Sequence, residues 1–292
     1  MKRRRRTIKH RWSADRKAAS GVVVTLLILL IAVGALSMFM SVYVPILGKD
    51  TESKQMKKVQ SQMLGMKESI DMQILASKNS TVTTRLTLGD DGGPVFHLTR
   101  TVGSITLNSD KGLYMLRNAT DANDVQGRGK GYVEYASANK YFIDQKYIYE
   151  NGAILIEQGG RTVMKAGPHF DVKKEPDGTY TAGITLISLN GISSSRSGVG
   201  DMRVKTTLSV FDVTRYSGGD WTAGRSVSFN ITSKHADIWF TYINSTLARP
   251  ENNLAATTDY TVVNWGGGIN ATLKNLNRLD MGLAIVEVRL EL

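Results

Sequence analysis

The feature that most constrains this chain is a run of 30 residues, 18–47, that contains no charged side chain. About 20 apolar residues are enough to cross a bilayer as an α-helix, so the run can span a membrane with length to spare. A cleaved secretory signal usually has an apolar core of only about 7 to 15 residues, which makes a discarded signal the weaker interpretation. A transmembrane helix over residues 19–47 is therefore expected.

The basic residues predict which end of this helix lies inside the cell. The net charge of the 292-residue chain is +11, and residues 1–17 hold nine lysines and arginines against one acid, Asp15. This block carries +8 and leaves +3 for all the rest. The positive-inside rule then places the N-terminus in the cytoplasm and the C-terminal domain outside. Because the charge ends where the apolar run begins, we expect no nucleic-acid partner.

Residues 48–78 continue the helix with an amphipathic pattern. Apolar residues recur at steps of three and four, at Met56, Val59, Met63, Met66, Ile70 and Ile74. Such a stripe predicts a helix of about 25 residues with Lys and Glu on its other face. The stripe must be covered either by the domain that follows or by the same helix of a neighbouring copy. Pro45 and Gly48 are expected to kink or loosen the helix near the outer membrane surface.

Small side chains share one face of the apolar run. Gly34, Ser37 and Ser41 are spaced i, i+3 and i+7, and small residues at this spacing let helices approach closely. Glycine is also frequent in transmembrane helices that make no such contact. A helix-packing face and an ordinary membrane composition are both consistent with the pattern.

Residues 79–292 carry the pattern of an extracellular β-rich domain. Short runs of two-residue alternation are separated by Gly, Asn and Asp. Asn151-Gly152 predicts a tight hairpin, and residues 175–178, Glu-Pro-Asp-Gly, predict a second turn between strands. The segment 238–243 is interpreted as a strand, with a helical patch over 233–247 as the alternative. The expected fold class is α+β, with a long transmembrane and amphipathic helix followed by a mainly antiparallel sandwich or meander.

Signatures of catalysis and cofactor binding are mostly missing from the sequence. There is no cysteine, and no two of the four histidines have metal-ligand spacing. The motif GRGKG at 127–131 lacks the hydroxyl residue of a phosphate loop and is interpreted as a flexible loop. Acids at 121–124 do not fit an EF-hand, although an irregular Ca²⁺ site stays open. We expect no cofactor and no enzyme activity; the turnover of a surface hydrolase would depend on Asp171, His169 or Glu150. His169 is interpreted as a surface residue in a turn.

All Asn-x-Ser/Thr motifs lie downstream of the apolar run. Their asparagines are Asn79, Asn118, Asn230, Asn244 and Asn270. Five is a mild excess over chance. It fits an exported domain that carries N-linked glycans.

A basic leader, small residues, an apolar helix, an amphipathic helix and a β-rich head, in this order, resemble type IV pilin-like proteins, the archaeal ones in particular. In that family a membrane peptidase cuts on the cytoplasmic side, after a charged residue followed by Gly or Ala, and leaves the apolar helix on the mature protein. Lys17-Ala18 followed by Ala19 matches this pattern. The resemblance implies prepilin peptidase as a partner, a leader of residues 1–18 and a cut between Ala18 and Ala19.

Parts of the body are similar to an uncharacterised archaeal pilin-like surface family. The similar blocks are residues 146–168, 182–192 and 226–243. The resemblance implies a structural or adhesive subunit of a pilus-like filament, joined to like or unlike subunits through the N-terminal helix. Bacterial pilins place a Glu just inside the apolar helix, whereas residues 21–25 here are uncharged. This departure puts the bacterial docking mechanism in doubt.

A different class of function is compatible with the same topology. In this alternative, the chain is a permanently anchored recognition module that does not polymerise and binds a glycan or a protein outside the cell. Aromatic residues that would form a glycan-binding surface are Trp221, Trp239, Tyr242 and Trp265.

Overall fold

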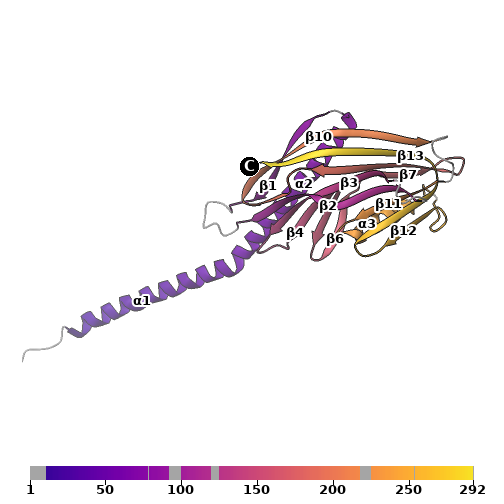
Figure 1. Cartoon of the computed structure of the whole chain (residues 1–292). Coiled ribbons are helices and arrows are strands. Elements are labelled where there is room, and N and C mark those ends of the chain that lie inside the picture. Colours follow the sequence, from indigo (N-terminus) through magenta and orange to yellow (C-terminus); the bar gives the residue numbers. More distant parts are fainter. Residues whose placement is uncertain are drawn as a thin grey trace, which may run out of the picture.

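A computed structural model describes residues 11–77, 79–91, 100–119, 125–217, 225–252 and 254–291. One long helix projects from a β-rich domain, and its second half runs into that domain (Figure 1). The α+β fold class expected from the sequence is confirmed.

The long helix is continuous from end to end. Helix α1 (Arg11–Met38) passes through a π-helical turn (Phe39–Tyr43) into α2 (Val44–Ala76), with helical backbone angles at both joints. Pro45 lies just after the π turn and has no N–H to bond to the carbonyl four residues earlier, so the helix adopts a wider turn there. The irregularity predicted near Pro45 is confirmed by this π turn, whereas α2 continues through Gly48 as regular helix. The helix ends at Ala76, and the next residue, Ser77, adopts the left-handed conformation (φ 48°).

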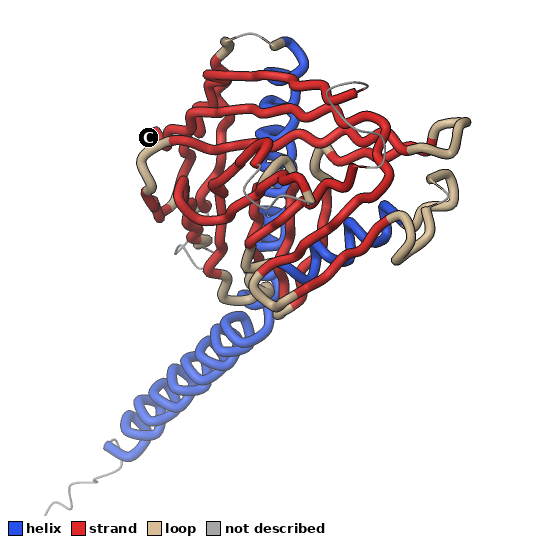
Figure 2. Tube along the Cα trace, turned by 45° about the vertical axis from the view of Figure 1, so that its right-hand side comes forward, coloured by secondary structure: helices blue, strands red, loops and turns tan. Residues whose placement is uncertain are grey.

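The strands of the described residues form one curved sheet. They are β1 (Thr81–Gly89), β2 (Val102–Asn118), β3 (Val125–Ala138), β4 (Gln145–Glu150), β5 (Ala153–Gln158), β6 (Arg161–Ala166), β7 (Phe170–Lys174), β8 (Tyr180–Asn190), β9 (Ser194–Gly198), β10 (Gly200–Ser217), β11 (Arg225–Thr232), β12 (Tyr260–Asn264) and β13 (Gly268–Glu291). The path is β1-β10-β13-β11-β2-β3-β4-β5-β6. Neighbours are antiparallel except β8 and β13, which run parallel. In Figure 2, strands surround α2 on several sides.

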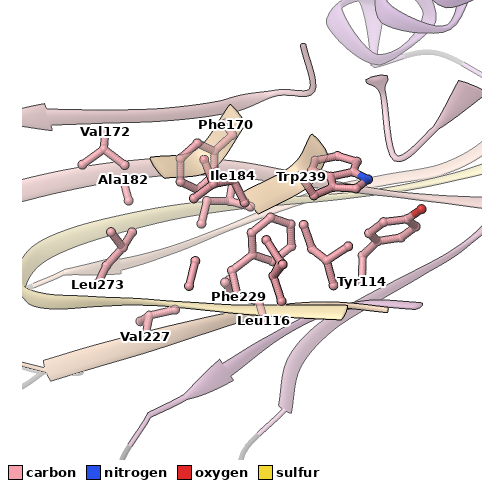
Figure 3. Packing of buried hydrophobic residues seen from close by; sticks show 14 of the residues in the cluster. Tyr114, Leu116, Phe170, Val172, Ala182, Ile184, Val227, Phe229, Trp239 and Leu273 are labelled. Carbon is pink, nitrogen blue, oxygen red and sulfur yellow. The ribbon is translucent and has the colours of Figure 1, made fainter. Parts of the chain in front are cut away.

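Two buried clusters lie on opposite faces of β4, β5 and β8. The α2 core joins the apolar stripe of α2 to residues of β1–β5, β8, β10 and β13. The α3 core joins helix α3 (Ala236–Leu247) to residues of β2, β4, β5, β7, β8 and β11–β13 (Figure 3). Along β4, Tyr147 and Tyr149 belong to the α2 core while Ile148 belongs to the α3 core. The middle of this strand, residues 147–149, is therefore buried on both faces.

Local turn signals were reliable. Asn151 and Gly152 have φ of 45° and 79° and join β4 to β5. Residues 175–178 form the turn between β7 and β8, where the Gly178 amide donates to the Glu175 carbonyl at 3.0 Å. Both predicted turns are confirmed.

The motif GRGKG is not a loop. Residues 127–131 belong to β3, where a Cβ on Gly129 would lie 2.8 Å from the Ile187 carbonyl oxygen and one on Gly131 2.8 Å from that of Leu189. The glycines let β3 pass directly against the backbone of β8. The loop interpretation was wrong because the need for glycine arises from a strand far away in the sequence.

Segment 238–243 is helical, so its interpretation as a strand was wrong, and the helical alternative holds. Helix α3 buries Trp239 and Ile243, four residues apart, on one face. Strands β7 and β9 and the first part of β13 were also missed. Strand β7 is only five residues long, β9 contains no apolar residue, and glycine, asparagine and charged residues interrupt the first part of β13.

Candidate functional site: the exposed helix and its junction with the domain

The first half of the long helix is bare. Every residue from Ser20 to Tyr43 is exposed, and the most apolar 18-residue window has a mean hydropathy of 2.8 with none of it buried. The part of the chain that the structure describes thus contains one helix long and apolar enough to cross a membrane. Length and composition alone support that statement.

The small-residue face lies within this bare segment. Gly34, Ser37 and Ser41 are all exposed, and nothing lies within 4 Å of the position that a Cβ on Gly34 would occupy. The described residues place no partner on this face. Lys17, Ala18 and Ala19 lie within α1, but their side chains are outside the described part, so the cleavage prediction stays a prediction.

The amphipathic stripe is covered by the chain's own domain. Its members are buried in the α2 core: Met56, Val59, Met63, Met66, Ile70 and Ile74. Burying one such side chain stabilises a fold by about 1.5–3 kcal/mol. Of the two alternatives for the stripe, contact with the following domain is the one that occurs.

Polar side chains of α2 fasten it to the surrounding strands. The Gln55 and Gln73 amides donate to the carbonyls of Thr87 and Thr206, at 2.9 and 3.0 Å. The buried Tyr147 hydroxyl donates to the Met56 carbonyl at 2.9 Å, and burial raises the pKa of Tyr147 to about 12. These bonds satisfy buried polar groups and fix the helix in register with the sheet.

Glu52 joins the helix to the β3–β4 loop. Its carboxylate accepts hydrogen bonds from the backbone amides of Lys140, Tyr141 and Phe142, at 2.8, 2.8 and 2.5 Å. Glu52 lies four residues before Met56, on the stripe, and is buried. The expectation that all acids lie on the opposite face was wrong here. A charged residue in an apolar register was the signal that marked this contact.

A second acid, the half-buried Asp71, connects the far end of α2 to the domain. Its carboxylate contacts Lys67 at 2.5 Å and His169 Nε2 at 2.9 Å. Burial raises the pKa of Asp71, but the hydrogen bonds and charges of His169 and Lys67 outweigh this, so the pKa is lowered from its usual 3.8. His169 is therefore part of a structural contact. No sequence spacing pointed to its partner, which is 98 residues away.

A pocket lies at one edge of the α3 core. Its volume is about 350 Å³, and its lining includes Glu134, Glu150, Lys111 and Lys234. Glu150 is buried and accepts hydrogen bonds from the Ser233 hydroxyl at 2.9 Å and from the Trp239 indole. None of the ion pairs among the described residues includes it.

Tyr114 is a buried residue of the α3 core whose hydroxyl lies near Glu150. Its buried hydroxyl lacks a partner in hydrogen-bonding geometry among the described residues. Burial, and next the charge of Glu150, raise the pKa of Tyr114 well above its usual 10. Glu150, His169 and Asp171 make no hydrogen bond or ion pair with one another, so within the described residues they do not form the constellation a hydrolase would need.

The other sequence-based candidates divide by exposure. Trp239 is buried, Tyr242 is half-buried and Trp265 is 53% exposed, whereas Trp221 and the acids at 121–124 lie outside the described residues. No group of three or more metal-ligating side chains occurs in the described part of the chain.

The asparagines of the glycosylation motifs also differ in their exposure to solvent. Asn79 and Asn244 are exposed, Asn230 and Asn270 are half-buried partners across β11 and β13, and Asn118 is buried.

The chain matches no model of a known protein family, no curated protein and no solved structure. The geometry of the helix and its junction is therefore the basis for a functional proposal.

Proposed function

We propose that this chain is a non-enzymatic, membrane-anchored surface protein of the type IV pilin-like kind, and that its N-terminal helix joins neighbouring subunits in a pilus-like filament. The N-terminus lies in the cytoplasm and the β domain outside the cell. The basic block at residues 1–17 supports this orientation.

The observation that carries the proposal is the division of one helix into two unlike halves. The segment Ser20–Tyr43 is exposed and apolar, while the apolar stripe of α2 is buried in the domain. Exposure of an apolar helix of this length to water is unfavourable, so lipid or other helices must cover it. Because the apolar stripe of α2 is already covered, the first half of the helix supplies the bare apolar surface for contacts between subunits.

Cleavage of the leader would decide how the helix is used. The first 17 residues carry +8, and each cation at the bilayer centre costs about 2.5–3.5 kcal/mol on insertion scales. An uncleaved leader therefore holds the helix in the membrane, whereas a cleaved one releases it for packing against identical helices.

Intact-mass analysis and N-terminal sequencing of the protein from its native host test this step. We expect a mature chain that begins at Ala19, and an Ala18→Leu variant that remains unprocessed and is absent from surface filaments. Ala35→Leu, within the apolar run, is the matched control and should be processed normally. A mature chain that keeps its basic leader would contradict the filament proposal and leave a permanent anchor.

The packing face can be tested separately because the chain has no cysteine. A Ser37→Cys variant should form disulfide-linked dimers in assembled material. Ala35→Cys is the control, since at 3.6 residues per turn it points about 160° away from Ser37. Equal cross-linking at the two positions would contradict a specific role for Gly34, Ser37 and Ser41.

The pocket at Glu150 favours a second function, that of a recognition module outside the cell. A buried carboxylate without a cationic partner is unfavourable, and a small ligand with hydroxyl or amine donors would complement Glu150, which lines the pocket. Thermal-shift measurements with panels of monosaccharides and amino acids test this function. A ligand that stabilises the natural chain should stabilise Glu134→Gln less. No shift with any compound in either panel would contradict the recognition function.

A further inference from the structure

The β domain begins to cover the helix before the apolar run ends. Val44 and Gly48, one turn apart, are buried by the domain, while Ile46 and Leu47 on other faces of the same turn are exposed. One end of the domain therefore lies beside the last turn of the apolar segment, at the point where the helix enters the domain in Figure 2.

The loop between β3 and β4, residues 139–144, occupies this position and is held firmly. The ring of Tyr141 lies against Gly48, so close that a Cβ there would be 2.1 Å from a ring carbon. Glu52 binds three successive amides of the loop, as described above. Within the loop, the backbone amide of Asn139 donates to the Asp144 carboxylate at 2.8 Å. The side-chain amide of Asn139 donates to the Ile143 carbonyl at 2.9 Å. The height of the loop along the helix is thus fixed.

The loop presents side chains suited to a lipid headgroup layer. Ile143 is 45% exposed, and Lys140 is exposed with its ammonium 5.1 Å from the centroid of the Tyr141 ring. Arg161, at the start of β6, is also exposed, and the β5–β6 turn is adjacent, since a Cβ on Gly159 would lie 3.2 Å from Ile143 Cδ1. Tyrosine is enriched at both membrane–water interfaces, and lysine and arginine near the ends of a transmembrane helix extend their charged groups into the headgroup layer.

Helix length places the loop at the right depth. The 30 uncharged residues 18–47 extend about 45 Å at 1.5 Å per residue, and a bilayer with its headgroups is about 40–45 Å thick. When the helix spans the membrane upright, Leu47 reaches the outer headgroups, and the loop at Gly48–Glu52 follows within about one turn.

We propose that the loop 139–144 is a membrane-contact site that rests on the outer headgroup layer, with Ile143 between headgroups and Lys140 bound to lipid phosphate. The occupant is lipid because this surface is continuous with the bare helix. The inference rests on the proposed membrane anchoring and adds that the domain is docked on the bilayer at a fixed height.

Single cysteines in the full chain, labelled with bimane and reconstituted in bilayers, test the contact. Lipids with a nitroxide on the headgroup should quench bimane at Ile143→Cys. Leu75→Cys is the matched control: it is exposed on α2 and lies about 40 Å farther along the helix than Gly48 at 1.5 Å per residue, so it should remain unquenched. Leu30→Cys, in the middle of the apolar run, should be quenched by lipids with a nitroxide on the acyl chain.

The outcomes separate the two ideas. If Leu30→Cys is quenched but Ile143→Cys stays as bright as Leu75→Cys, the helix is anchored and the contact site is wrong. If Leu30→Cys is not quenched in reconstituted bilayers, the anchoring and the contact site are both wrong. A further substitution, Lys140→Gln, should reduce the quenching at Ile143→Cys in anionic more than in neutral bilayers.

Discussion

Replacing Met63 with alanine tests whether α2 is part of the core of its own domain. Met63 is 0% exposed and lies in the α2 core. Truncating a buried methionine to alanine costs about 2–5 kcal/mol, because transfer energy is lost and a cavity remains. Methionine is flexible and its surroundings adapt well, so we expect the lower part of this range, about 2–3 kcal/mol.

The same helix provides a matched control. Met72 is 65% exposed, and its replacement by alanine makes the same chemical change at the surface, where substitutions usually stay within about 0.5 kcal/mol. In a domain of about 200 residues, 1 kcal/mol shifts the midpoint of thermal unfolding by about 2–4 °C. Met63→Ala should therefore lower the midpoint by roughly 4–12 °C, and Met72→Ala by about 2 °C or less.

The measurement is thermal unfolding of the full chain in detergent micelles, followed by near-ultraviolet circular dichroism at several protein concentrations. Similar small shifts for both variants would contradict the assignment of the stripe to the α2 core. If the lower unfolding temperature of Met63→Ala returns to that of the natural chain when the protein is diluted, the stripe is instead covered by another copy of the chain.

Three further predictions follow from the described contacts. Gly129→Ala should destabilise the domain by about 1–3 kcal/mol in denaturant unfolding, because its Cβ would overlap the β8 backbone; Gly183→Ala, with nothing within 4 Å, should not. The lowered pKa of Asp71 contributes stability above its unfolded pKa of about 3.8 that is lost as pH falls through the lower folded pKa, so Asp71→Asn should flatten stability against pH below about 4. Glycan mapping should find Asn118, which is buried, unmodified when Asn244 carries a glycan.

Each of these expectations has a contradicting result. Equal stability of the two glycine variants would mean that β3 and β8 do not cross as closely as described. An acid profile unchanged by Asp71→Asn would assign the acid sensitivity to other carboxylates with lowered pKa, such as Asp201 and Asp280. A glycan on Asn118 would require that end of β2 to be accessible.

The sequence by itself determined the features that depend on neighbours along the chain. An uncharged run of 30 residues needs no partner to show that it can cross a bilayer. The recurrence of Met56, Met63 and Ile70 every seven residues predicts a buried face for the same local reason. Asn151-Gly152 specifies a hairpin because few residues other than glycine and asparagine adopt positive φ readily.

Tertiary structure alone decided which surfaces those local features meet. The periodicity of α2 was compatible with burial against the chain's own domain or against a neighbouring helix, and only the fold shows that the domain covers it. Glu52 accepts hydrogen bonds from three amides about 90 residues away. Position 129 requires glycine because the backbone of β8 lies against it. Such contacts depend on how distant strands cross, and no local pattern encodes the distance between two backbones. The peptide bond between Ala18 and Ala19 differs from both, since a peptidase and not folding decides its fate in the proposed function.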